Sequence, residues 1–195
     1  MPNNIFQETL ARAARAGITP YAGKSLDWFR EQMANVRTTP RKILTSEDLN
    51  VVKTPRPGRM YMYTYDPLHK ATLPYYDTFP LIFMIETYSD GFLGLNLHYL
   101  PLSLRAKLMD ALYELTNNKR YDESTKLRLS YKVLQSASKY KYFAPCIKRY
   151  LIDHVRSKFV EITADKWDAA LFMPLHRFKK ASAEKVWRDA RNGVR

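Results

Sequence analysis

The chain has 195 residues, of which 46% are hydrophobic and 13% aromatic, and this composition excludes a disordered chain and suffices for one domain. A single cysteine, Cys146, excludes an internal disulfide and a cysteine-based zinc finger. Lys and Arg outnumber Asp and Glu by 32 to 19, so the net charge is +13, which favours a polyanionic partner. The longest apolar run, residues 80–85, is far shorter than the roughly 20 residues that span a bilayer, so we expect no membrane partner.

Residues 1–57 are predicted to form an extended N-terminal arm that reaches outward and carries short helices. The first helix is expected to end at Gly17, and the hydroxyl of Ser25 is expected to cap a second one. Beyond that helix, prolines and basic residues favour an extended backbone that wraps around a domain or a partner.

The strands are expected between residues 58 and 100. Apolar and aromatic residues alternate over 60–65, the run 79–88 is apolar on both faces, and alternation returns over 92–100. Short turns between these runs predict a small antiparallel sheet or an SH3-like barrel, which strands at 159–162 and 171–175 would complete.

The second half of the chain is predicted to be helical, over 101–158 and 182–192. Leu104, Leu108, Leu112 and Leu115 share one helix face. Pro145 is expected to start a helix whose residues Ile147, Tyr150, Leu151 and Val155 face inward, and Ser182 is expected to cap the last helix. The sequence therefore predicts the α+β class, with a single domain over 58–195 that follows the arm.

The positive charge is concentrated in one segment. Residues 119–158 hold 11 basic and 3 acidic side chains, interleaved with tyrosines. Basic side chains neutralise phosphates, and exposed aromatic rings stack on bases, so this pattern is typical of nucleic-acid binding. In the alternative interpretation the tyrosines belong to the hydrophobic core and the lysines form an ordinary solvated face. The predicted nucleic-acid-binding residues are Lys119, Arg120, Lys126, Arg128, Lys132, Lys139, Lys141, Lys148 and Arg149. Residues of the arm that would extend this face are Arg37, Arg41, Lys42, Arg56 and Arg59.

A catalytic role is the alternative to nucleic-acid binding. Asp77 and Glu86 flank a predicted strand, as the carboxylates of metal-dependent nucleases do, but Tyr88 stands where that chemistry usually has a lysine. Capping of a turn also explains Asp77. No two histidines have the spacing of metal ligands. His98 is predicted to be a structural residue on a strand, and Cys146 is predicted to be a small buried residue. We expect no catalytic residue, no metal, no cofactor and no small-molecule substrate.

Several long strings resemble proteins of large contractile-tailed bacteriophages. They include GRMYMYTYDP, LPYYDTFPLIFMIE, DGFLGLNLHYLPLSLRAKLMDALYE and SKYKYFAPCIKRYLIDHVRSKFVEI, and the similarity covers about residues 23–192. The resemblance is to head-completion proteins of the DNA end protector type. It implies a virion protein, present in the host cytoplasm during assembly, that binds the end of packaged DNA and helps to complete the head beside other virion proteins. The alternatives are a structural baseplate or neck subunit, whose charge docks on acidic neighbours, and the nuclease.

Overall fold

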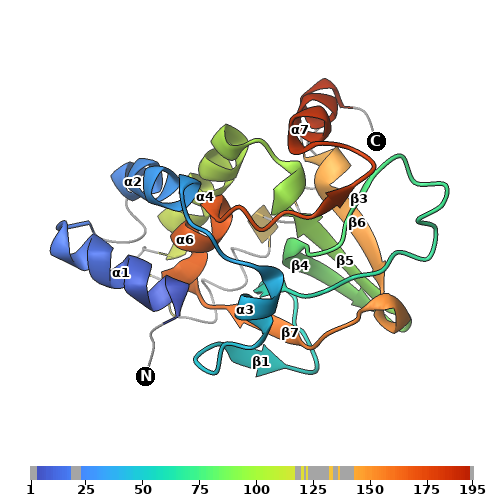
Figure 1. Ribbon diagram of the computed structural model, residues 1–195, viewed down its shortest axis with the longest axis horizontal. Coiled ribbons are helices and arrows are strands. Elements are labelled where there is room, and N and C mark those ends of the chain that lie inside the picture. The colour runs from blue at the N-terminus through green and yellow to red at the C-terminus, as the bar shows by residue number, and fades with distance from the viewer. Residues whose placement is uncertain are drawn as a thin grey trace.

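The computed structural model describes residues 4–18, 23–116, 120, 122, 132, 133, 136 and 143–193. These residues form an α+β structure, which confirms the predicted class (Figure 1). The α-helices described are α1 (Ile5–Arg15), α2 (Gly23–Ala34), α3 (Pro40–Leu44), α4 (Leu102–Thr116), α6 (Trp167–Phe172) and α7 (Ala183–Asn192). None of the helices in this part of the chain is both long enough and apolar enough to cross a bilayer.

The main sheet is antiparallel and has the strand order β1-β7-β2-β4-β5-β6. Its strands are β1 (Asn50–Val52), β2 (Met60–Met62), β4 (Leu81–Tyr88), β5 (Gly91–Asn96), β6 (Ile147–Leu151) and β7 (Phe159–Ile162). Two short strands, β3 (Tyr76–Asp77) and β8 (Phe178–Lys179), pair separately.

The sheet is open, so the small antiparallel sheet is the correct prediction and the SH3-like barrel is wrong. A barrel would require β6 to pair with β1 along its outer edge. At that edge the backbone N–H of Leu151 instead donates to the hydroxyl of Tyr65 at 3.1 Å, and Tyr65 forms an isolated bridge with Val155. The hydroxyl of Tyr65 therefore takes a backbone donor at the end of β6.

The alternation over residues 60–65 divides the core between the two faces of the sheet. Met60 and Met62 belong to the larger cluster, which the helices cover, whereas Tyr61, Tyr63 and Tyr65 belong to a second, mainly aromatic cluster. Figure 1 shows α1, α2, α4 and α6 gathered at one side of the molecule, beside the sheet. The period-two prediction for this strand is confirmed, because each face receives one set of side chains.

The N-terminal segment packs against this body. Phe29 and Met33 of α2 are fully buried in the larger cluster, and α2 contacts α6. Ser25 lies inside α2 rather than at its N-cap, and its hydroxyl donates to Asp168 at 2.9 Å. The division of the chain into an arm over 1–57 and a domain over 58–195 stays a prediction.

In the second half, the helix ends are partly as predicted. The hydroxyl of Ser182 caps α7, and Gly193 follows it with a φ of 71°. The predicted helix after Pro145 is wrong: a single 3₁₀ turn over Ala144–Cys146 leads directly into strand β6. The predicted strand over 171–175 is also wrong, since Leu171 and Phe172 end α6.

Candidate nucleic-acid interface

Two of the predicted basic residues, Lys148 and Arg149, lie side by side in sequence on β6 and line one pocket. Arg120 and Lys132 are exposed and do not line it. The remaining predicted residues lie outside the described part of the chain: Lys119, Lys126, Arg128, Lys139 and Lys141.

The pocket has a volume of about 420 Å³ and lies between β6 and residues 65–77. Five tyrosines line it: Tyr65, Tyr75, Tyr76, Tyr99 and Tyr150. Two of them, Tyr75 and Tyr76, are half-buried and precede or begin β3, in a stretch where the sequence predicts only a loop between strands. Sequence analysis missed this contribution, although the dipeptide of adjacent tyrosines before a short strand is visible in LPYYD.

Lys148 is half-buried, and its ammonium nitrogen lies 4.4 Å from the centroid of the Tyr99 ring. Burial lowers the pKa of this ammonium group below its usual value. Within the described residues, no carboxylate lies within ion-pair distance of it. A partly desolvated cation without a counter-ion can gain strongly from an incoming anion, because the surrounding protein screens the attraction less than water does.

Arg149 lies at the exposed rim of the pocket. Its guanidinium forms an ion pair with Asp90, and its central carbon lies 4.1 Å from the centroid of the Tyr88 ring. These two contacts hold the guanidinium at the end of the β4–β5 hairpin. A phosphate would compete with Asp90 for it, so Arg149 contributes orientation as well as charge.

Asp77 lies at the wall of the pocket, but its carboxylate is already occupied. It accepts hydrogen bonds from the backbone N–H groups of Phe79 and Arg177, both at 3.0 Å, and lies 2.7 Å from Nδ1 of His98. Burial alone would raise the pKa of Asp77, but His98 and the two backbone donors together hold it below its usual value. Burial also lowers the pKa of His98, so the pair is best described as a carboxylate that accepts from a neutral imidazole.

The nuclease alternative is not supported. Glu86 is exposed and accepts a hydrogen bond from the Tyr88 hydroxyl at 2.8 Å, while Asp77 is buried in its own network. The bond from Phe79 N–H to Asp77 is the turn cap that the sequence predicts. In the described residues, no three His, Cys, Asp or Glu side chains come together as metal ligands.

Cys146 is buried, as predicted, and burial raises the pKa of its thiol to about 12. We therefore expect the native protein to resist alkylation by a maleimide or iodoacetamide at pH 8, because the thiolate is scarce and covered. Mass spectrometry before and after unfolding in guanidinium measures this directly. Rapid labelling of the native protein would contradict the expected burial.

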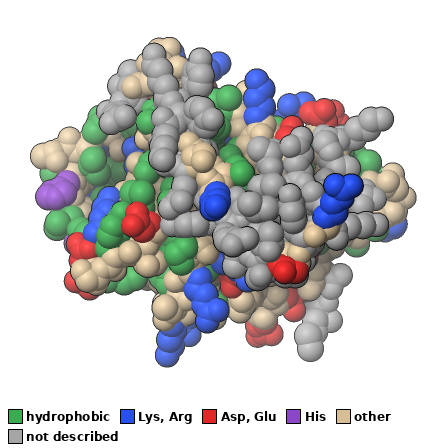
Figure 2. Space-filling view, turned by 180° about the vertical axis from the view of Figure 1, so that it is seen from behind, with side chains coloured by type: hydrophobic (Ala, Val, Ile, Leu, Met, Phe, Trp, Pro, Cys, Tyr) green, Lys and Arg blue, Asp and Glu red, His purple; other side chains and the backbone are tan. Residues whose placement is uncertain are grey.

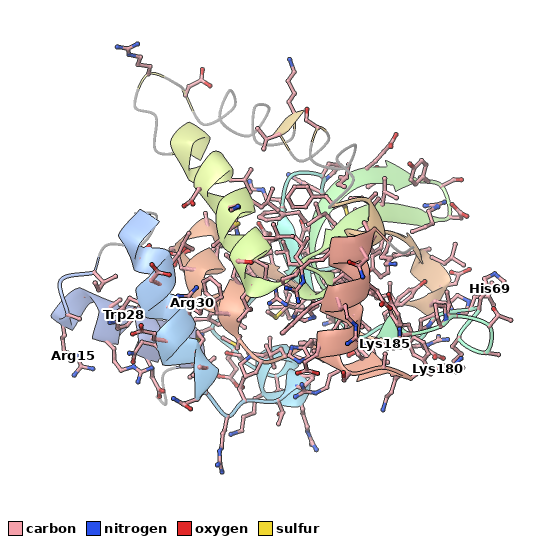
Figure 3. All side chains as sticks on the ribbon, turned by 90° about the horizontal axis from the view of Figure 1, so that it is seen from above. Arg15, Trp28, Arg30, His69, Lys180 and Lys185 are labelled. Carbon is pink, nitrogen blue, oxygen red and sulfur yellow. The ribbon has the colours of Figure 1, made fainter. Side chains whose placement is uncertain are left out.

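The loop beside the pocket is fixed by a lysine from a distant part of the chain. Lys180 donates to the carbonyl oxygens of Lys70, Ala71 and Leu73, at 2.6, 2.8 and 3.0 Å. Figure 3 shows His69, Lys180 and Lys185 at one end of the molecule, opposite Arg15, Trp28 and Arg30. Because His69 lines the pocket, this end of the molecule is the one that carries it.

The basic residues of the N-terminal segment are exposed but separate from the pocket. Arg37 and Lys42 line another hollow, of about 720 Å³, together with acidic residues, and Arg59 forms an ion pair with Glu161 at 3.4 Å. Arg41 and Arg56 are also exposed. On the face shown in Figure 2, described Lys and Arg side chains stand at several separate places, with acidic side chains among them.

The helices and the open antiparallel sheet define an α+β protein. A family model described as Phage T4 terminal DNA protecting protein matches residues 3–190, nearly the whole chain. The chain therefore belongs to this family: it is a phage protein that protects the ends of DNA, with a structural and not an enzymatic role. No curated protein and no solved structure matches it significantly. The family gives no support to a baseplate subunit, which corrects that alternative.

Proposed function

We propose that the protein holds the end of the DNA at the β6 pocket, which is the pocket lined by Lys148, Arg149 and the five tyrosines. The observation that carries this proposal is the half-buried Lys148, whose ammonium group has no carboxylate partner among the described residues and lies over an aromatic ring. A phosphate at the DNA terminus supplies the missing negative charge. The half-buried rings of Tyr75 and Tyr76 offer flat apolar surface to the bases that the end of a duplex exposes.

We further propose that the other basic residues extend this face along the DNA backbone. Their charge supports the proposal, since each phosphate contact adds to affinity without reading sequence. The residues concerned are Lys119, Arg120, Lys126, Arg128, Lys132, Lys139 and Lys141.

The location of the protein in the phage and its protein neighbours are also proposals. We propose that the protein is carried in the virion, at the end of the packaged DNA, and helps to complete the head beside other virion proteins. The family's description supports the DNA end as the partner.

The test compares two doubly substituted proteins that each lose two positive charges. Lys148→Met with Arg149→Gln changes the pocket, whereas Arg15→Gln with Arg30→Gln changes the opposite end of the molecule (Figure 3). For a blunt linear duplex, we expect the pocket variant to bind at least tenfold more weakly and its salt slope to fall by about 2. The control variant is expected to stay within a factor of about three of the wild type.

A closed circular duplex completes the experiment, because it has the same backbone and no ends. The wild type is expected to prefer the linear form, and the pocket variant is expected to lose this preference. Equal losses in both variants would mean that the charge acts from the whole surface, and the pocket would not be the binding site.

A further inference from the structure

We infer that the β6 pocket receives one unpaired nucleotide from the DNA terminus, with its base against a tyrosine ring and its phosphate at Lys148. This inference rests on the proposed function, because it takes the β6 pocket as the place where the DNA end binds. It adds the form in which the end is bound, which is a locally opened terminus and not an intact last base pair.

The size of the pocket selects a single nucleotide. Its volume of about 420 Å³ lies at the lower end of the range of about 300–1,000 Å³ that is usual for small-ligand pockets. One base with its sugar and phosphate fits this space, whereas a base pair needs about twice as much. Residues of β6 line one side of the pocket, and residues of the segment 65–77 line the other.

The tyrosines differ in what they can offer a base. Tyr99 and Tyr150 are only 4% exposed, and Tyr75 packs against Tyr99 with 6.1 Å between ring centroids. Tyr76 is half-buried, lines the pocket, and makes no contact with another ring or a cation among the described residues. Its ring is therefore the surface on which a base can stack without displacing a partner.

The polar groups in the pocket fit a phosphate rather than a cation. Lys148 brings a positive charge that lacks a counter-ion among the described residues, and Arg149 stands at the rim. The one carboxylate of the lining, Asp77, is engaged by His98 and two backbone amides and adds no free acceptor. The phosphate of the stacked nucleotide, joined to its base through the sugar, would lie at Lys148.

The same geometry explains how ends can be distinguished from the rest of a duplex. A base inside a duplex loses two stacking neighbours when it leaves the helix, whereas a terminal base loses only one. Unpairing is easier still for a base that is already mismatched. A pocket that accepts only an unpaired nucleotide therefore favours termini without reading their sequence.

The test measures affinity for two linear duplexes of equal length and charge, one with paired blunt ends and one with a mismatched last base pair at each end. We expect the wild type to bind the mismatched ends about tenfold more tightly, because the unpairing is already done. Tyr76→Ala is expected to abolish this difference, and Tyr76→Phe, which keeps the ring, is expected to retain it. Circular dichroism and the thermal midpoint verify that both variants are folded.

The outcomes separate this inference from the proposed function. Equal affinity of the wild type for both duplexes would overturn the single-nucleotide pocket, even if the Lys148→Met, Arg149→Gln protein still bound both of them weakly. A preference that persists in folded Tyr76→Ala would overturn it as well. If the Lys148→Met, Arg149→Gln protein binds ends as tightly as the wild type, the proposed function itself fails.

Discussion

Replacing Asp77 with alanine is expected to lower the free energy of unfolding by about 3–5 kcal/mol, because it leaves several buried donors without their acceptor. These donors are the backbone N–H groups of Phe79 and Arg177 and the imidazole of His98. They come from β4's entry, from the segment before β8, and from the 3₁₀ turn Leu97–Tyr99, so one carboxylate joins three parts of the fold. Urea unfolding at pH 7 measures the loss.

The pH dependence follows from the lowered pKa of Asp77. A carboxyl group whose pKa is lower in the folded state stabilises the protein above its unfolded pKa, about 3.9, and this stabilisation is lost as the pH falls through the folded value. The wild type should therefore lose stability on acidification below pH 4 more steeply than Asp77→Asn, which keeps an oxygen acceptor but does not titrate.

Asp153→Ala is the matched control, because Asp153 is an exposed carboxylate. Its free energy of unfolding is expected to stay within about 0.5 kcal/mol of the wild-type value. Equal stability of Asp77→Ala and Asp153→Ala would mean that the buried network contributes nothing. The prediction would then be wrong.

Gly91→Ala is expected to lower the free energy of unfolding by about 3 kcal/mol and to weaken DNA-end binding together with it. A Cβ atom at residue 91 would lie 1.9 Å from the backbone carbonyl oxygen of Tyr150, so β5 and β6 would have to separate. Because β6 carries Lys148, a shift of this strand also changes the pocket. Chemical denaturation and the linear-duplex titration measure the two effects.

Gly17→Ala provides the contrast at a second glycine. Gly17 has a φ of 68°, and a Cβ there would meet nothing within 4 Å, so only backbone strain of about 1 kcal/mol is expected. DNA-end binding should not change. If both glycine variants lost the same stability, the contact between Gly91 and Tyr150 would not be what limits the side chain at position 91.

The sequence predicts best where local pattern and burial agree. The alternation over 60–65 separates two methionines from three tyrosines, and the Ser182 cap with Gly193 defines α7, as expected. The segment 147–155 misled the prediction because its apolar spacing after Pro145 is also that of a helix. Residues 147–151 form a strand because they pair with β5, and residues 91–95 of β5 are more than 50 positions away in sequence.

The residues of the candidate site were likewise only partly predictable from the sequence. Lys148 and Arg149 were predicted from charge alone, and the structure places them at one pocket. Tyr75 and Tyr76 are visible in the sequence as adjacent tyrosines in LPYYD, but this local pattern does not show that they lie beside β6. They line the pocket because the fold brings residues 65–77 beside β6. This placement depends on contacts between residues more than 80 positions apart. No periodicity within a short window encodes such contacts.

The attachment of Lys180 to the loop at 70–73 has a consequence for biosynthesis. The loop is made first, β6 follows some 75 residues later, and Lys180, which fixes the loop, is made after both. A nascent chain that has not yet reached residue 180 thus lacks the three hydrogen bonds that hold the loop beside the pocket. The order of synthesis therefore delays the fixing of this loop until after β6 has been made, and chains that stop before residue 180 are expected to lack a loop held in place.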